Sequence, residues 1–539
     1  METAIQRALM ILNGYFYHNF SVDELKIINR ELNLILDCGE LTIQQNDMKL
    51  SYEELQEKLL TLNEKEVNRK DKGVYYTSID LVEFILINCV KLISGKLKPN
   101  GVHVLDLNGI PYKKFCYELV VFDPTCGTGA FTNKALELKL DLLDLHQKNI
   151  TKNQLLKVIR TVRGNDLNET STTLSKIRMF LCVLSRYGVD VISGISEAIN
   201  DCFDNYDFVS NTEYDCRGYD IIVGNPPYVE DSKSLSKPSI KFGNIYANVL
   251  DNATRKLKPN GVIGFVIPLS YTSTPRMKGI RDILINKLPI QYILNYADRP
   301  DCLFPSVHQK LCIVFGKNKL SEEEIYTSGY RYWYKEERKN LFTSTEVVRN
   351  KFAQQEFIPK LGNMLDTSIY KKIIRNKSEL YYHLSGNAVE IHLNMRATFW
   401  IKCFLKGRNR GSEYKTFYCD DSAEAALCMC ILNSSLFWWY WTCVSDCWHI
   451  TRKELAGFKI PVQRDYSQPL MLAAELEDLL EKTKVYVGTK QTDYEYKHKE
   501  CIRVIHKIDD YVCDIFGLSE EEKVYIKNYA YRYRSGSGA

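Results

Sequence analysis

The stretch ELVVFDPTCGTGAF, residues 118–131, places a Gly-x-Gly turn between an apolar run and a sequence with helical spacing. Glycines in such a turn let a ligand approach the backbone, and they expose the N–H groups that begin the helix. No third glycine follows Ala130 and no Lys follows the glycines, so the stretch is neither a dinucleotide fingerprint nor a P-loop. Asp123 precedes the glycines, which suits a ligand with a positive group. We expect a strand, turn and helix that bind a small molecule; the alternative is a tight structural turn.

Similar apolar runs predict an α/β domain with a mostly parallel sheet over residues 71–320. Each run is short, bounded by Gly, Pro, Asp or Asn, and separated from the next by a helical segment. The runs are TVRGNDL, YDIIVGNPP, GVIGFVIPLS, QYILNYAD and KLCIVFGK. Residues 1–70 have helical spacing. Residues 321–539 are basic, aromatic and irregular, and they end in a helical stretch and a tail, 531–539, that we expect to be frayed.

The composition bounds the classes of protein to which the chain can belong. Of 539 residues, 45% are hydrophobic and 26% charged, which excludes a disordered chain and a fibrous repeat. No window approaches 18 uninterrupted apolar residues and no secretory signal pattern opens the sequence, so we expect a soluble intracellular protein. The 17 cysteines follow no repeating frame, and we expect them to be mostly reduced and buried.

Positive charge gathers in one part of the chain. The net charge is only +4, yet residues 331–420 hold 17 Lys and Arg against nine Asp and Glu. Such an excess fits a phosphate-binding surface, and it fits a solvated lysine-rich face equally well.

Two further acids follow the glycine turn at the ends of later apolar runs. Asp166 ends the next run, where nucleoside-binding α/β folds hold the two ribose hydroxyls on a carboxylate. Asp207 precedes an aromatic residue near a third run, and its carboxylate is a candidate acceptor for the exocyclic amine of an adenine. An Asp in this setting is also common in plain turns.

The sequence Asn225-Pro226-Pro227-Tyr228 follows the buried run DIIVG. Two prolines fix the backbone, so that the Asn225 side chain and the Pro226 carbonyl can converge as acceptors on one amine. Tyr228 can stack on a planar ring at the end of such a rigid loop. These groups can hold an exocyclic amine and direct its lone pair at an electrophile.

Over residues 71–320 the motifs and their order resemble the gamma-class N6-adenine DNA methyltransferases of type II restriction-modification systems, in which the glycine loop precedes the Asn-Pro-Pro-Tyr motif and the recognition domain comes last. The resemblance implies a Rossmann-like S-adenosylmethionine-dependent methyltransferase domain with an N-terminal helical region, 1–70, and a C-terminal α+β target recognition domain, 321–539. It implies cofactor contacts from Tyr76, Thr77, Asp123, Pro124, Cys126, Gly127, Gly129, Phe131, Asp166, Asp207 and Asn225. It implies catalytic roles for Asn225, Pro226, Pro227 and Tyr228, and for Phe304, which would stack on the other face of the base.

By this resemblance the protein would methylate N6 of a flipped-out adenine at a specific site in double-stranded DNA. We expect a cytoplasmic monomer, bacterial or phage-encoded, with S-adenosylmethionine as cofactor, no metal and a restriction endonuclease encoded separately. Two alternatives stay open: a methyltransferase subunit that needs a separate specificity protein, and an RNA or protein-glutamine methyltransferase that uses the same chemistry. The roughly 220 residues after 320 argue against the latter, whose members are usually shorter.

The candidate DNA contacts lie in the basic third region. Lys406, Arg408 and Arg410 form a Gly-flanked basic loop, and His449 and Arg452 belong to a segment, 441–453, that resembles the later part of recognition regions. The thiols of Cys428, Cys430, Cys443 and Cys447 lack the paired spacing of a zinc site, so we favour buried thiols. Most of the nearby tryptophans, residues 438–448, are expected to be core.

Overall fold

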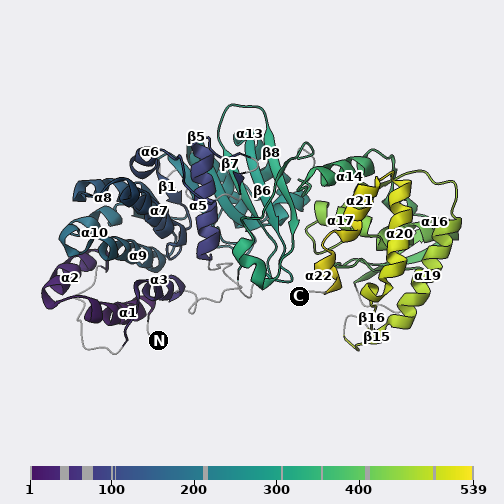
Figure 1. Cartoon of the computed structure of the whole chain (residues 1–539), viewed down its shortest axis with the longest axis horizontal. Helices are drawn as coiled ribbons and strands as arrows, with labels where there is room; N and C mark the ends of the chain where they lie inside the picture. Colours follow the sequence, from purple (N-terminus) through teal and green to yellow (C-terminus); the bar gives the residue numbers. More distant parts are fainter. Residues whose placement is uncertain are drawn as a thin grey trace.

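Three blocks of secondary structure lie side by side in the order of the sequence (Figure 1). The computed structural model describes residues 3–36, 48–62, 77–98, 101–102, 105–210, 217–304, 308–353, 356–406, 413–489 and 493–536. Helices of the N-terminal end come first, a sheet with its flanking helices occupies the middle, and a mostly helical block forms the other end. The bounds of these blocks do not coincide with those of the three sequence stretches, because the central sheet continues past residue 320 to Val348–Arg349.

The central sheet has nine strands within the described residues, in the order β3-β2-β1-β4-β5-β7-β6-β8-β9. They are β1 (Val121–Asp123), β2 (Val162–Asn165), β3 (Phe203–Asp204), β4 (Tyr219–Gly224), β5 (Leu257–Pro268), β6 (Ile290–Tyr296), β7 (Leu311–Lys317), β8 (Glu324–Arg331) and β9 (Val348–Arg349). The first five in the sheet order are parallel, and β7 is antiparallel to both β5 and β6. The strand order reverses between β1 and β4, a switch point that opens a crevice outside the carboxyl ends of the strands. The predicted α/β domain is present, and its sheet continues beyond residue 320 through β8 and β9.

Helices pack closely on both faces of this sheet. They are α5 (Ile79–Ile93), α6 (Tyr112–Tyr117), α7 (Ala130–His146), α8 (Lys152–Ile159), α9 (Glu169–Tyr187), α10 (Ile195–Asn200), α11 (Ile245–Lys256), α12 (Ser270–Ser273) and α13 (Lys278–Lys287). A Cβ on Gly264 of β5 would lie 2.4 Å from the Sγ of Cys89 in α5, and a Cβ on Gly316 would lie 2.7 Å from Leu288, just after α13. Because Gly316 pairs with Ile263, the neighbour of Gly264, and successive side chains point to opposite faces, α5 and the end of α13 cover opposite faces.

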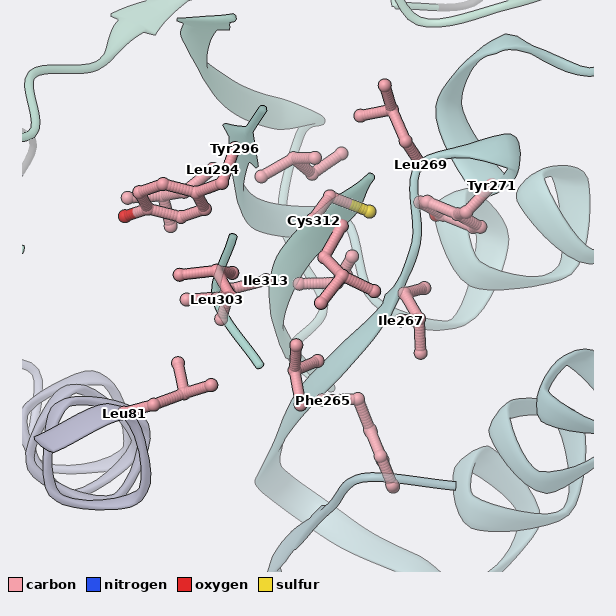
Figure 2. Close-up of a cluster of buried hydrophobic side chains, with 14 of the residues drawn as sticks. Leu81, Phe265, Ile267, Leu269, Tyr271, Leu294, Tyr296, Leu303, Cys312 and Ile313 are labelled. Carbon is pink, nitrogen blue, oxygen red and sulfur yellow. The ribbon is translucent and has the colours of Figure 1, made fainter. Parts of the chain in front are cut away.

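The core of the middle block joins α5 to the last strands of the parallel part of the sheet. Figure 2 shows Leu81 of α5 pointing toward the side chains of Phe265, Ile313 and Leu303. All four side chains are buried. The segment that carries Leu303 is therefore anchored in the core next to β5 and β7.

The N-terminal helices α1 (Ala4–Asn19), α2 (Val22–Leu36) and α3 (Tyr52–Thr61) bear out the helical spacing of their sequence. They pack against α9 and α10 through polar as well as apolar contacts. Gln56 of α3 accepts from the Arg178 Nε at 2.8 Å and donates to the Arg178 carbonyl at 3.1 Å. Glu31 of α2 accepts from the Gly194 N–H at 3.1 Å, at the start of α10. These helices are thus packed directly on the helices that flank the sheet.

The C-terminal block surrounds a small antiparallel sheet, β12-β11-β13, with helices. Its main elements are η5 (Lys335–Asn340), α14 (Met364–Ile374), β10 (Ser378–Glu379), α15 (Leu380–His383), β11 (Val389–Asn394), β12 (Cys403–Phe404), β13 (Tyr414–Cys419), α16 (Ser422–Asn433), α17 (Ser435–Val444), α18 (Arg452–Gly457), β14 (Lys459–Ile460), α19 (Ser467–Thr483), β15 (Val485–Tyr486), β16 (Tyr494–Glu495), α20 (Ile502–Ile515), α21 (Glu520–Asn528) and α22 (Tyr531–Ser535). The predicted core role is confirmed for Trp438, Trp439 and Trp441 of α17, which are at most 1% exposed.

Within the described residues no single helix is both long and apolar enough to cross a membrane. The helices α16 and α17 reach that length and apolar character only as a pair bent by 62°.

The expectation of a frayed tail is wrong for residues 531–535. They form α22, and Arg534 of this helix is only 4% exposed. Its guanidinium lies 4.1 Å from the ring centroid of Trp400 and 4.3 Å from that of Trp438, and it donates to the Phe399 carbonyl and the Ser435 hydroxyl at 3.1 Å. A basic, Tyr-rich tail resembles a solvated segment in sequence, whereas here two tryptophan rings bury one arginine.

Arg534→Ala should lower the free energy of unfolding of the C-terminal block by about 2–4 kcal/mol, because it removes two desolvated cation–π contacts and two hydrogen bonds. Arg532→Ala is the matched control on the same helix, since Arg532 is 49% exposed and pairs with Glu337; it should cost less than about 1 kcal/mol. Urea unfolding followed by tryptophan fluorescence measures both. Equal losses of free energy of unfolding in the two variants would show that the buried contacts of Arg534 stabilise the block no more than the exposed pair of Arg532 does.

Candidate functional site

A cavity of about 680 Å³ opens at the carboxyl ends of β1, β2 and β4, on the side where the strand order reverses. This volume lies within the range of small-molecule sites. Of the residues predicted to bind cofactor or to act in catalysis, those that line it are Thr77, Asp123, Pro124, Cys126, Gly127, Phe131, Asp166, Asp207, Asn225 and Pro227. The structure therefore brings together, in one cavity, side chains that are 150 residues apart in sequence.

The glycine loop forms the wall of the cavity above β1. Gly127 and Gly129 have φ angles of 53° and 86°, in the left-handed region that glycine adopts readily. A Cβ on Gly129 would lie 2.2 Å from the Ser175 Oγ of α9, so a side chain there would also push the two helices apart. Gly129 is not in the lining itself; it sets the turn from which α7 starts.

Asp166 fastens the glycine loop to the end of β2. One of its carboxylate oxygens accepts from the Gly127 N–H at 2.9 Å, and the other accepts from the Asn168 N–H at 2.9 Å. Burial raises the pKa of Asp166. The carboxylate thus faces the cavity with part of its hydrogen-bonding capacity used by backbone donors.

Asp123 is the more deeply placed of the two acids, with only 2% of its surface exposed. It accepts from the Thr125 N–H at 3.0 Å. Burial, and to a lesser degree repulsion from Asp166, raises the pKa of Asp123 well above its usual value. Strand β4 runs close beside it, because a Cβ on Gly224 would lie 2.9 Å from the Asp123 Oδ1. A ligand with positive charge would relieve the repulsion between these carboxylates.

Asp207 lies in the turn after β3 and completes the row of acids. Its Oδ1 accepts from the Val209 N–H at 2.9 Å, and its Oδ2 accepts from the Ser210 hydroxyl at 2.7 Å. The amide of Asn165 holds this turn against the glycine loop, since it donates to the Pro124 and Tyr206 carbonyls, each at 3.0 Å. Asn165 was not among the predicted site residues, although it stands directly before Asp166 at the end of β2.

The Asn-Pro-Pro-Tyr loop leaves β4 at Gly224. The Asn225 Nδ2 donates to the Thr77 Oγ1 at 3.0 Å, which orients the amide. Asn225 and Pro227 line the cavity, whereas Pro226 and Tyr228 are not in its lining. Because the amide nitrogen is directed at Thr77, the oxygen is the end of the side chain available to act as an acceptor in the pocket.

The two aromatic rings that were predicted to hold the base are those of Tyr228, in this loop, and Phe304. The Tyr228 hydroxyl donates to the Val266 carbonyl at 2.9 Å, which ties the ring to β5. The centroid of the Phe304 ring lies 6.5 Å from that of Tyr228, at an interplanar angle of 32°. A planar ring stacked between two others needs about 7 Å between the outer rings. Phe304 is only 1% exposed and neither ring is in the lining of the cavity, so a base would have to part the two rings to stack between them.

The cavity also has walls that the sequence did not indicate. Leu60, just inside the end of α3, lines it, and the Leu60 carbonyl accepts from the Thr128 hydroxyl at 2.7 Å. The loop 233–236 lines it from the other side. Tyr76, predicted as a cofactor contact, lies outside the described residues. Because the apolar end of α3 carries no nucleotide motif, the sequence alone could not show that Leu60 lines the cavity.

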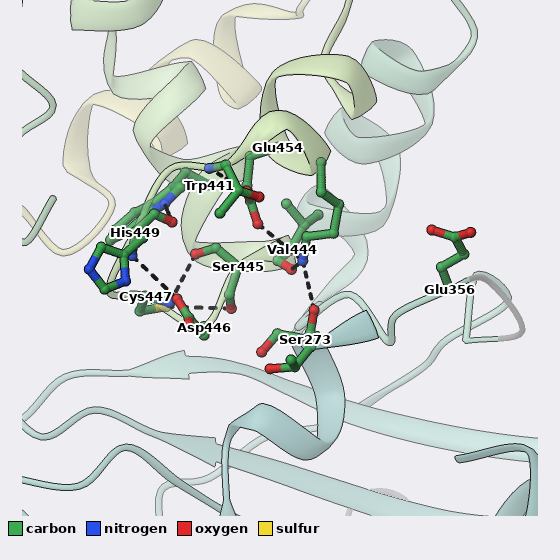
Figure 3. Close-up of polar contacts among 12 residues, drawn as sticks. Ser273, Glu356, Trp441, Val444, Ser445, Asp446, Cys447, His449 and Glu454 are labelled. Atoms are coloured by element: carbon green, nitrogen blue, oxygen red, sulfur yellow. Dashed lines mark hydrogen bonds and ion pairs between the residues drawn. The ribbon is translucent and has the colours of Figure 1, made fainter. Parts of the chain in front are cut away.

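The predicted DNA contacts occupy different places in the C-terminal block. Lys406 is exposed after β12 and lies 3.6 Å from Asp478 of α19, whereas Arg408 and Arg410 lie outside the described residues. His449 is exposed in a turn that Asp446 organises, as Figure 3 shows, with the His449 N–H donating to the Asp446 Oδ1 at 3.3 Å.

Arg452 is exposed a few residues later, at the start of α18, where its guanidinium lies 4.8 Å from the Tyr381 ring centroid. His449 and Arg452 are three residues apart in sequence, and Lys406 contacts a different element, α19.

The cysteines in the described part of the chain are buried, including Cys428, Cys430, Cys443 and Cys447. Among the residues that the structure describes, no three or more His, Cys, Asp or Glu side chains form a group that could hold a metal ion.

Asp123→Asn should stabilise the ligand-free protein increasingly as the pH rises above the 3.8 of an ordinary Asp. The raised pKa means that the folded protein holds a proton that the unfolded chain releases, so stability is full at low pH and is lost as the pH rises. Asparagine cannot ionise and keeps the acceptor for the Thr125 N–H. Thermal unfolding of wild type and variant from pH 4 to 8 measures the difference, and Asp190→Asn, at an exposed position, is the control. A difference that does not change with pH would contradict this assignment.

The chain is similar in sequence to part of several known methyltransferases. The model of the Eco57I restriction-modification methylase family matches residues 131–302. The chain is 26% identical over 275 residues to the type II methyltransferase M.BanIII of Aneurinibacillus aneurinilyticus, covering 49% of this chain and 41% of that protein. It is 24% identical over 205 residues to M.BstVI of Geobacillus stearothermophilus, covering 36% of each. The chain thus matches about two-fifths or less of the length of these relatives.

Among solved structures, the chain is similar to the type IIL restriction-modification enzyme MmeI in complex with DNA, at 12% identity and a TM-score of 0.50 over 89% of this chain and 81% of that one. At such low identity the likeness shows the fold alone. The predicted fold class is confirmed: the chain has a Rossmann-like α/β fold similar to that of MmeI.

Proposed function

We propose that this protein is a site-specific DNA methyltransferase that transfers a methyl group from S-adenosylmethionine to N6 of an adenine flipped out of double-stranded DNA. One observation carries the proposal: Asn225, at the carboxyl end of β4, lies on the wall of the cavity that also holds Asp123 and Asp166. An acceptor for an amine and acids for a positively charged nucleoside thus meet in one site. The similarity to type II methyltransferases supports the same chemistry.

The cavity fits the proposed cofactor in charge and in shape. The two acids with raised pKa values favour a ligand that carries a sulfonium and an ammonium group. Asp166 would accept from the ribose hydroxyls and Asp207 from the adenine amine, while Gly127 allows the ligand to approach the loop backbone. When bound, S-adenosylmethionine supplies an electrophilic methyl group. Thr77 lies on the same wall as Asn225, where it would border the methionine part of the ligand.

The aromatic pair would hold the extruded base. Flipping an adenine out of the duplex costs a few kcal/mol. Stacking of a base on an aromatic ring contributes roughly 1–3 kcal/mol for each ring, so Tyr228 and Phe304 together can offset that cost. The hydrogen bond from Tyr228 to Val266 keeps one face of this pocket in place while the base enters.

Asn225 and the Pro226 carbonyl would activate the amine. Its lone pair is delocalised into the ring, and two acceptors on the amino hydrogens localise it on nitrogen. As nitrogen attacks the methyl carbon, these acceptors stabilise the positive charge that develops there. The bond from Asn225 to Thr77 holds the amide in the orientation that presents oxygen. The proton can leave the nitrogen after the transfer.

The C-terminal block would supply target recognition, with Lys406, Arg408, Arg410, His449 and Arg452 as the proposed DNA contacts. The excess of positive charge in residues 331–420 and the similarity to MmeI, a protein whose structure contains DNA, support this role. We also propose that the enzyme is a monomer and that a cognate restriction endonuclease is encoded separately.

Asn225→Ala should lower kcat for methylation by about 10²–10³, because the lost acceptor acts chiefly in the transition state. Asp166→Ala should affect cofactor binding instead: it should weaken the affinity for S-adenosylmethionine about 10- to 150-fold, by roughly 1.5–3 kcal/mol. Calorimetry with S-adenosylmethionine and single-turnover methylation of DNA separate the two effects. Activity near that of wild type in Asn225→Ala would exclude this mechanism.

The substrate is identified by sequencing DNA from cells that express the chain alone, with detection of modified bases. N6-methyladenine at one sequence is the expected result. Unmodified DNA together with methylated RNA or glutamine would favour the other methyltransferase class, and methylation only after addition of a specificity subunit would favour a partner-dependent enzyme.

Lys406→Ala should weaken binding to all DNA sequences alike and reduce the salt slope by about one unit, as expected for a phosphate contact. Lys507→Ala is the matched control, because both lysines are exposed and paired with acids of α19. Arg452→Ala should instead relax the choice of base at one position of the methylated sequence. Fluorescence anisotropy at several salt concentrations and modified-base sequencing measure these effects. If Lys406→Ala binds as Lys507→Ala does, the loop after β12 lies away from the DNA.

A further inference from the structure

Arg338 connects three segments that are far apart in sequence. It lies in η5, beyond the expected end of the catalytic domain, and reaches back to the start of α5. Its Nε lies 2.7 Å from the Asp80 Oδ2 and its Nη2 lies 3.0 Å from the Asp80 Oδ1, which makes a two-point ion pair. The same Nη2 donates to the Ser78 hydroxyl at 2.7 Å, and Nη1 donates to the Leu303 carbonyl at 3.2 Å. One guanidinium thus joins the start of α5 to the segment around Leu303.

Two of these contacts, Ser78 and Leu303, are one residue away from a group in the proposed site, and Asp80 lies in the first turn of α5 just after Ser78. Ser78 follows Thr77, whose hydroxyl accepts from Asn225. Leu303 precedes Phe304, whose ring lies opposite Tyr228. Arg338 therefore fixes, relative to each other, the backbone that orients the amine acceptor and the backbone that carries one of the stacking rings.

The Arg338 side chain is itself held in place. Its guanidinium lies 5.2 Å from the Phe342 ring centroid, and that ring stacks on Phe84 of α5 at 4.8 Å. The side chains of Arg338 and Asp80 are 22% and 44% exposed, so solvent screens the pair only in part. Burial alone would raise the pKa of Asp80, but its hydrogen bonds with the guanidinium lower it overall. A planar fork with several donors can make all of these contacts at once, which an ammonium group cannot.

We propose that Arg338 is a positioning residue for methyl transfer, which sets the distance between the Asn225 acceptor and the Phe304 ring through Ser78, Asp80 and Leu303. This inference rests on the proposed function. Without Arg338, the segment with Phe304 and the start of α5 can shift independently, so the base is held less well against the acceptor. Misplacement by about 1 Å is enough to lower a catalytic rate on the order of 10²-fold.

Arg338→Ala and Arg532→Ala form a matched pair for the test. Arg338 belongs to η5, Arg532 pairs with Glu337 of η5, and both are partly exposed, but the ion pair of Arg532 involves neither Asp80 nor the segment around Leu303. Arg338→Ala should lower kcat on the order of 10²-fold, leave the affinity for S-adenosylmethionine unchanged, and reduce the fluorescence change of 2-aminopurine placed at the target adenine of the recognised duplex. Arg532→Ala should match wild type in all three measurements.

Milder variants separate positioning from folding. Arg338→Lys keeps the charge but not the fork and should restore only part of the rate, and Asp80→Asn should reduce kcat less than Arg338→Ala does. In the double variant Arg338→Ala with Asp80→Ala, the losses should be far from additive, because each single change already breaks the same link.

The outcomes distinguish this inference from the proposed function. If the wild-type chain does not methylate DNA, the proposed function is wrong and this inference is wrong with it. If the wild-type chain methylates DNA while Arg338→Ala matches Arg532→Ala in rate and fluorescence, or Arg338→Lys restores the full rate, the inference alone is overturned. Should Arg338→Ala fail to fold, Arg338→Lys and Asp80→Asn at wild-type kcat would overturn it equally.

Discussion

The hydrogen bond from the Gly127 N–H to the Asp166 carboxylate is the contact on which the site depends. It ties the loop after β1 to the end of β2, and the second oxygen of the same carboxylate holds Asn168 at the start of α9. One carboxylate therefore connects the ends of β1 and β2 with the starts of α7 and α9. Asp123 and Asp166 are both buried here, and this burial raises the pKa of each, with repulsion from Asp166 adding to the rise at Asp123. The fold accepts this local repulsion, and a cationic nucleoside is the partner that would remove it.

The core of the site followed from sequence because parallel strands end at the same edge. Asp123, Asp166 and Asn225 each stand at the end of a buried run, so the order of strands alone brings them together. The contributions of Leu60 and of Arg338 could not be predicted, because neither belongs to a motif and both depend on packing between distant segments. For the same reason, the continuation of the sheet through β8 and β9 has no signal in a stretch that reads as irregular.

Two lysine amines bind carbonyls at the end of α17 in the C-terminal block, and one of them also reaches α12 beside the sheet. Lys360 donates to the Ser445 carbonyl at 2.7 Å, and Lys453 donates to the carbonyls of Val444 at 2.8 Å and Ser273 at 2.7 Å. The end of α17 has carbonyls without partners in the helix, and cations are favourable there. Lys453 therefore caps α17 and links it to α12 of the middle block. The proposed DNA surface on the C-terminal block would be held relative to the pocket by contacts of this kind.

The burial of Arg534 between two tryptophans has a consequence for synthesis of the protein. The central sheet is complete once β9, ending at Arg349, has left the ribosome, but the surface around Trp400 and Trp438 stays open until α22 arrives. The 96 residues between positions 438 and 534 take roughly 5–20 s to translate at about 5–20 residues per second. During this interval an unfinished aromatic surface is exposed beside a folded domain. Chaperones that recognise such surfaces would meet this chain late in translation, after the cavity has formed.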